Sequence, residues 1–160
     1  MEPAPLLDIL HVDPDFVIVN KVSGMLSIPG RGPEKIDSVT DRVKRMFAVD
    51  INYPAVHRLD MDTSGLMVVP RTKEALRNIS IQFQERLTKK RYVSLLEGKL
   101  EGEGGTIELP FRLDVDNRPI QIYDEEHGKM GTTHWENMGI EGEYTRISYV
   151  PLTGRTHQLR

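Results

Sequence analysis

Short segments rich in β-branched and aromatic residues constrain the fold most, because they run in clusters and do not alternate regularly with helices. Regular alternation of strands and helices would predict a parallel sheet, whereas strands in runs predict an α+β fold. We therefore expect a mixed, largely antiparallel sheet with flanking helices. The expected strands are residues 8–12, 16–19, 90–96, 106–113, 120–123, 132–135 and 145–150.

Two segments have helical periodicity. The first follows a capping-box pattern at 38–41, with apolar residues at helical spacing up to an expected end near Ala48. Thr72 can cap the second helix. An apolar stripe then follows, which we assign to the core: Leu76, Ile79, Phe83 and Leu87.

Length and composition predict one globular domain over residues 1–160, large enough to bury a core. The chain has no cysteine, which excludes disulfide scaffolds, thiol catalysis and thiolate metal sites. No apolar stretch is long enough to cross a bilayer. We expect a cytoplasmic protein that does not bind membranes, with a monomer as the default state.

Charge is distributed unevenly along the chain, although the formal net charge is only −3. Residues 65–100 contain eight basic and three acidic residues, whereas residues 101–130 contain eight acidic and three basic ones. Phosphate binding depends on clustered Lys and Arg. The asymmetry therefore allows one positive face on an acidic protein, although a solvated helix would carry many of the same charges.

The loop His57–Gly65 places a carboxylate, Asp60, after a cation and before a turn-forming Thr-Ser-Gly. Apolar residues precede it at Ala55-Val56 and follow it at 66–70, which predicts a strand, a tight turn displaying Asp60, and a second strand. Two interpretations are open from these residues alone. The loop carries a nucleophile, or it is an ordinary surface turn of the kind that Asp, Ser and Gly commonly form.

Three further segments accompany this loop: Asn20–Gly30, Lys89–Val93 and Leu152–Arg160. In order and rough spacing, the four segments resemble the RluA-type pseudouridine synthases. The resemblance spans nearly the whole chain. Its most specific part is the loop around Asp60, whereas the basic segment beginning at Lys89 would be weak evidence alone.

The resemblance implies a pseudouridine synthase fold with a central catalytic cleft. It also implies isomerisation of specific uridines to pseudouridine in structured RNA, either large-subunit ribosomal RNA, the anticodon stem-loop of transfer RNA, or both. RNA is the implied partner, and neither a metal nor an organic cofactor is required. Members of this family continue with a helix and strands beyond residue 160, so we expect the C-terminal part of the catalytic domain to be missing.

The resemblance also assigns site residues. Asp60 matches the catalytic carboxylate, and Arg155 the guanidinium that keeps it ionised and oriented. Tyr92 matches a tyrosine that stacks on the uracil and serves in proton transfer. Arg58 is placed to fill the gap left by a flipped base, and His57 to help hold the RNA. The expected phosphate contacts are Lys21, Arg31, Lys89, Lys90 and Arg91.

Two other functions compete with this interpretation. Asp60 and Asp62, if two residues apart on one strand, would lie roughly 6 to 7 Å apart and suit glycoside or nucleoside hydrolysis. A non-catalytic RNA-binding module is the other. An aspartic protease would need a second comparable loop, which is not found, and a metal site at His127 and His134 lacks a third ligand at recognisable spacing.

Overall fold

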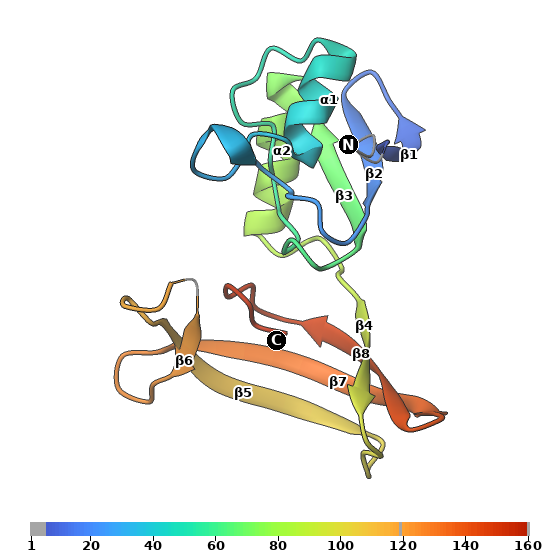
Figure 1. The fold of residues 1–160 in the computed structure, drawn as a ribbon, viewed down its shortest axis with the longest axis vertical. Helices are drawn as coiled ribbons and strands as arrows, with labels where there is room; N and C mark the ends of the chain where they lie inside the picture. Colours follow the sequence, from blue (N-terminus) through green and yellow to red (C-terminus); the bar gives the residue numbers. More distant parts are fainter. Residues whose placement is uncertain (1–5, 119, 160) are drawn as a thin grey trace. The chain divides into compact units, whose positions relative to one another are not determined.

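The computed structural model describes residues 6–118 and 120–159, and the chain divides into two compact units between Thr88 and Lys89 (Figure 1). The first unit contains β1 (Asp8–Val12), β2 (Phe16–Lys21), α1 (Val39–Phe47), β3 (Gly65–Pro70) and α2 (Lys73–Gln84). The second contains β4 (Tyr92–Glu97), β5 (Gly104–Leu113), β6 (Gln121–Tyr123), β7 (Lys129–Glu141) and β8 (Tyr144–Pro151). Every strand pair among the described residues is antiparallel, which confirms the α+β class.

The first sheet has the strand order β1-β2-β3. Along β2 every second residue is buried, because successive side chains of a strand point to opposite faces. Val17 pairs with Val69 and Val19 with Met67, so four buried side chains share one face. The helices add their own buried residues to this core: Val39, Val43 and Ala75. A lysine, Lys21, continues the buried face of β2.

Both predicted helix starts are confirmed. The Ser38 hydroxyl accepts a hydrogen bond from the Asp41 amide at 3.3 Å, and the Thr72 hydroxyl accepts one from the Ala75 amide at 3.1 Å. The first helix ends as expected at Ala48, which adopts a left-handed conformation. The predicted apolar stripe of α2 extends too far. The helix ends at Gln84, and the last predicted member of the stripe, Leu87, lies beyond this end and is 64% exposed.

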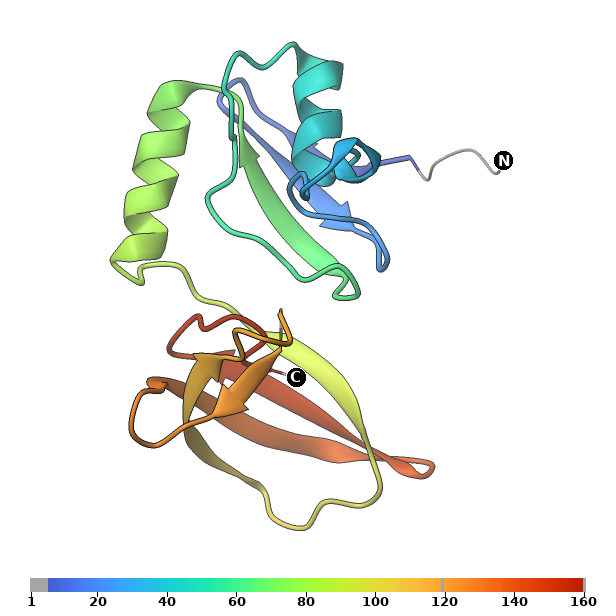
Figure 2. The ribbon, with the colours of Figure 1, turned by 60° about the vertical axis from the view of Figure 1, so that its left-hand side comes forward.

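The predicted hairpin around Asp60 is wrong. Residues 48–64 contain no strand, and Figure 2 shows this long segment running from the end of α1 to the start of β3. The partner of β3 is β2. Ala55-Val56 therefore lies within this loop, because β3 makes its ladder hydrogen bonds with a strand from much earlier in the chain.

The second sheet has the order β4-β8-β7-β5-β6, so the expected strands form two sheets. Its longest strand, β7, covers 129–141 and not only the predicted 132–135. It pairs with β5 on one side and β8 on the other. Because both neighbours supply ladder hydrogen bonds, the strand includes polar residues and continues beyond a register shift at Asn137/Gly139. No helix in the described part of the chain is long and apolar enough to cross a bilayer.

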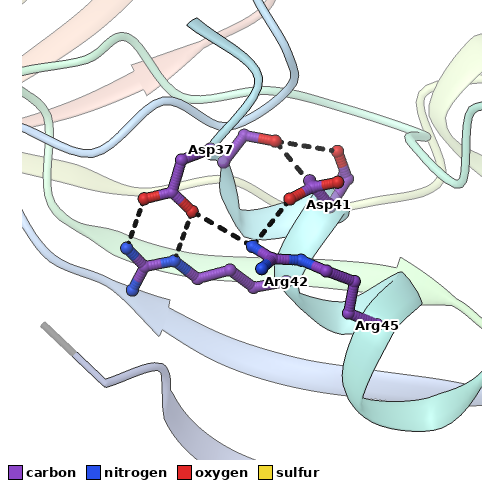
Figure 3. A network of polar contacts seen from close by, with 6 residues as sticks. Asp37, Asp41, Arg42 and Arg45 are labelled. Carbon is purple, nitrogen blue, oxygen red and sulfur yellow. Dashed lines mark hydrogen bonds and ion pairs between the residues drawn. The ribbon is translucent and has the colours of Figure 1, made fainter. Parts of the chain in front are cut away.

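An ion-pair network holds the loop before α1 to the helix (Figure 3). Asp37 accepts from the Arg42 Nε at 2.7 Å and also pairs with its second guanidinium nitrogen. Arg45 joins Asp37 to Asp41 at 3.5 and 2.8 Å. The hydrogen bond from Arg42, with the charges of Arg42 and Arg45, lowers the pKa of Asp37.

We predict that Asp37→Asn lowers stability at pH 7 by less than about 1 kcal/mol, because Asp37 is half exposed to water. A lowered folded-state pKa contributes stability above the unfolded pKa of about 4, and this contribution is lost as the pH falls through the folded value. Urea denaturation from pH 7 to pH 2.5 should show the two proteins converging in acid. The exposed Asp50→Asn serves as control, and a constant difference across this range would contradict the assignment.

Candidate active site

Asp60 lies half-buried in a turn just before β3. The Thr63 amide donates to the Asp60 carbonyl at 3.1 Å and closes the turn, which also contains Asp62. The two carboxylates are therefore not on one strand. This corrects the geometry on which the hydrolase interpretation depended, since the spacing expected for it was that of an extended chain.

The loop after β2 holds the backbone on both sides of Asp60. The Ser27 hydroxyl donates to the Leu59 carbonyl at 2.6 Å and accepts from the Leu59 amide at 3.0 Å. Beyond Asp60, the Gly24 amide donates to the Met61 carbonyl at 2.9 Å. The Ser23 hydroxyl donates to the carbonyl of the next residue, Asp62, at 2.8 Å. Two loops distant in sequence are thus joined by one layer of hydrogen bonds to the backbone residues before and after Asp60.

Lys21 lies beneath this layer and is only 1% exposed. Its ammonium donates to the carbonyls of Val22, Met25 and Met61 at 3.0, 2.8 and 2.7 Å. An ammonium has three donors, so these carbonyls use all of them. The expectation that Lys21 contacts phosphate is wrong, because the group is buried and already bonded.

Burial lowers the pKa of Lys21, while the negative charges of Asp62 and Asp60 act in the opposite direction. The buried ammonium of Lys21 and the two carboxylates thus belong to the same unit.

His57 anchors the segment leading to Asp60. Its ring stacks on Phe83 of α2 with centroids 4.7 Å apart and planes 15° apart. Its Nε2 accepts a hydrogen bond from the Val68 amide of β3 at 3.0 Å. These contacts are those of a structural histidine, and its contact with RNA stays a prediction. Arg58 and Arg31 are exposed on loops of the same unit.

The second unit carries the other predicted catalytic residues. Tyr92 begins β4, is half-buried, and pairs with Tyr149 of β8. Arg155 is exposed in the turn after β8, and its Nε donates to the Met130 carbonyl at 3.0 Å. Asp60 belongs to the first unit, whereas Tyr92 and Arg155 belong to the second.

Gln158 organises the turn that presents Arg155. Its side-chain oxygen accepts from the Arg155 amide and the Thr153 hydroxyl, both at 2.8 Å. Its side-chain nitrogen donates to the Thr132 carbonyl at 3.1 Å and the Thr133 hydroxyl at 2.9 Å on β7. The turn is thereby tied to the sheet by one amide group. Arg160, the last residue of this motif, lies outside the described residues.

The predicted basic segment lies at the start of this unit. Lys89 is exposed, and the Arg91 Nε donates to the Ser148 hydroxyl at 2.8 Å. A Cβ added at Gly154 would lie 4.0 Å from the Lys90 ammonium, which places Lys90 beside the turn of Arg155. In the second unit, Lys90 and Arg155 therefore lie close together in the fold. The contacts of Lys89, Lys90 and Arg91 with phosphate stay predictions.

His127 and His134, which were considered as metal ligands, each lie beside a different polar side chain. His134 Nδ1 is hydrogen-bonded to the Thr106 hydroxyl at 2.8 Å, and His127 lies 3.7 Å from Asp124. No group of three or more His, Cys, Asp or Glu side chains suited to a metal ion is found in the part of the chain that the structure describes.

The RNA pseudouridylate synthase family model matches residues 15–160. The chain belongs to this family. It is 45% identical over 157 residues to a relative from Pasteurella multocida (strain Pm70), and 44% identical over 160 residues to one from Escherichia coli (strain K12). Both are named dual-specificity RNA pseudouridine synthase RluA, and each match covers 98% of this chain and 70% of the relative.

Two solved structures of the family have a similar fold. Human RNA pseudouridylate synthase domain containing 1 aligns with a TM-score of 0.78 and 26% identity, covering all of this chain and 66% of that one. Human RNA pseudouridylate synthase domain containing 4 aligns with a TM-score of 0.72 over 95% of this chain and 61% of that one, and its 22% identity supports the fold alone. This chain therefore spans about two thirds of the length of its structural relatives.

Sequence reasoning missed the structural roles of Lys21, Ser27 and Gln158. A signal existed for Lys21, since it continues the buried alternation of Val17 and Val19 on β2. A lysine at such a position must be buried and bonded. For Ser27 no local signal exists, because its partner lies 32 residues away, and for Gln158 the bonds to β7 span about 25 residues.

We predict that Lys21→Met lowers the free energy of unfolding by about 2 kcal/mol, because it leaves buried carbonyls without a donor at similar side-chain volume. Urea denaturation at pH 7 measures this. Lys44→Met is the matched control, since the Lys44 ammonium makes one exposed, long hydrogen bond of 3.4 Å. Equal losses in the two variants would contradict the structural role of Lys21.

Proposed function

We propose that this protein isomerises uridine to pseudouridine in structured RNA, with Asp60 as the catalytic carboxylate. One observation carries the proposal: relatives named RNA pseudouridine synthase are about 44% identical across 98% of the chain. The segment that supplies Asp60 lies within the match of the family model. Its backbone is held by hydrogen bonds on both sides, as a precisely placed nucleophile requires.

The reaction breaks the bond between N1 of uracil and C1′ of ribose and forms one between C5 and C1′. The proton leaving C5 is released, and N1 gains one, so the product is an isomer of the substrate. Asp60 acts as the carboxylate nucleophile in this exchange. No electrons are gained or lost, so the proposal needs neither a redox partner nor an external group.

The remaining roles follow the family resemblance. Arg155 would orient the Asp60 carboxylate, and Tyr92 would stack on the uracil and take part in proton transfer. Arg58 would occupy the space left by the extruded base, and the half-exposed loop before β3 gives it access to solvent. His57, Arg31, Lys89, Lys90 and Arg91 complete the proposed RNA contacts.

We assign the substrate to large-subunit ribosomal RNA, the anticodon stem-loop of transfer RNA, or both. The relatives' name describes a dual specificity, which supports more than one RNA class. Recognition of such loops depends on their shape and on unstacked bases. A cytoplasmic location agrees with these substrates and stays a prediction.

Asp60→Asn should abolish pseudouridine formation while RNA binding is retained, because it removes the nucleophilic charge at nearly constant volume. Pseudouridine is quantified by mass spectrometry of mixed transfer and ribosomal RNA after incubation with each variant, and binding by filter retention. Asp62→Asn is the matched control and should retain activity. Full activity of Asp60→Asn would rule out Asp60 as the nucleophile, whereas release of free base or sugar that depends on Asp62 would favour a hydrolase.

Arg155→Ala should lower the single-turnover rate by about a hundredfold or more, with a smaller effect on RNA affinity, if the guanidinium orients Asp60. Arg118→Ala, which removes an exposed arginine from the same unit, should change the rate by less than about twofold. A pure loss of affinity that is largest at low salt would instead assign Arg155 to phosphate binding.

A further inference from the structure

Ser27 lies in the loop between β2 and α1 and is 4% exposed. Buried polar groups in proteins are almost always hydrogen-bonded, and a hydroxyl offers one donor and two acceptor positions. The Ser27 hydroxyl forms two hydrogen bonds with one residue, Leu59, once as donor and once as acceptor. It donates to the Leu59 carbonyl at 2.6 Å and accepts from the Leu59 amide at 3.0 Å.

This pair of bonds holds both peptide groups that flank the Leu59 α-carbon. The Leu59 side chain is also buried, at 8% exposure. The residue directly before Asp60 is therefore held through its amide, its carbonyl and its side chain. The carbonyl that Ser27 binds belongs to the peptide whose nitrogen is that of Asp60, so a rotation of this peptide would redirect the carboxylate.

Other hydrogen bonds from the same loop act after Asp60. The Ser23 hydroxyl is exposed and donates to the Asp62 carbonyl, while Lys21 and the Gly24 amide both donate to the Met61 carbonyl. Ser27 is thus the side chain of this loop that restrains the approach to Asp60 from the N-terminal side.

We propose that Ser27 is a positioning residue for the reaction: its two hydrogen bonds to Leu59 aim the Asp60 carboxylate at the ribose. The inference rests on the proposed function of Asp60. Its physical basis is that displacing a reacting group by about 1 Å can lower a rate by a hundredfold. Without the hydroxyl, the buried amide and carbonyl of Leu59 lose these partners, and the peptide is free to adopt other orientations.

The test compares Ser27→Ala with Ser38→Ala in the purified chain. Ser38 is also buried in the same unit and caps α1, so its loss also lowers stability, while its hydroxyl bonds Thr40 and Asp41 and not the residues beside Asp60. Single-turnover rates of pseudouridine formation at saturating RNA, RNA dissociation constants and melting temperatures are measured for both. We expect Ser27→Ala to lower the rate by about tenfold or more with affinity within about twofold, and Ser38→Ala to change the rate by less than about twofold.

Three outcomes would overturn the inference. The first is an unchanged rate in folded Ser27→Ala, and the second is a fall in rate that matches Ser38→Ala at equal loss of melting temperature. The third is a loss of RNA affinity alone, which would make Ser27 an RNA contact. If Ser27→Ala does not fold, Ser27→Cys replaces it, since a thiol keeps the volume but forms weaker hydrogen bonds, and it should still lower the rate.

The unsubstituted chain and Asp60→Asn distinguish failure of this inference from failure of the proposed function. Product that depends on Asp60 but not on Ser27 would overturn the positioning role alone. Absence of Asp60-dependent product in the unsubstituted chain would overturn the proposed function, and the positioning role with it.

Discussion

The buried ammonium of Lys21 is the interaction on which the candidate site depends. Removing an ammonium from water is costly unless it is fully hydrogen-bonded. Here three carbonyls provide those bonds, two from the loop after β2 and one from the loop of Asp60. The two loops must therefore come together for the lysine to be buried, and the serines and the Gly24 amide add further bonds across the same contact.

The two units position their functional residues in different ways. In the first, Asp60 lies on a loop that is fixed by another loop and by His57 against β3 and α2. In the second, Tyr92 is part of a strand, and Arg155 lies on a turn fastened by Gln158 to the long strand β7. Hydrogen bonds from side chains to backbone groups help to hold both loops. Such short-range bonds depend little on ionic strength, in contrast to RNA binding.

Much of the fold could be predicted from local patterns in the sequence. The caps at Ser38 and Thr72 and the antiparallel strands follow from short-range chemistry, and they are found as expected. The hairpin at Asp60 was predicted wrongly because the apolar run after it pairs with β2, a distant strand. The length of β7 and the division into two sheets likewise depend on which strands meet, which local propensity does not determine.

The family resemblance identified the residues of the candidate site, whereas their hydrogen bonds and burial are known only from the structure. Lys21 was expected to contact RNA phosphate, yet it continues the buried face of β2 in the alternation of that strand. The bond pair of Ser27 with Leu59 and the bonds of Gln158 to β7 join distant parts of the chain and could not be predicted from sequence.

The most direct measurement of the central claim follows the hydrogen on C5 of uridine. RNA carrying tritium at C5 of its uridines is incubated with the protein, and the label is traced. Pseudouridine formation joins C5 to C1′, so the account predicts that tritium passes into water while the RNA keeps its bases. Tritium that remains on uracil released from the RNA would show hydrolysis, and tritium that remains in intact uridine would show binding without isomerisation; either result would contradict the account.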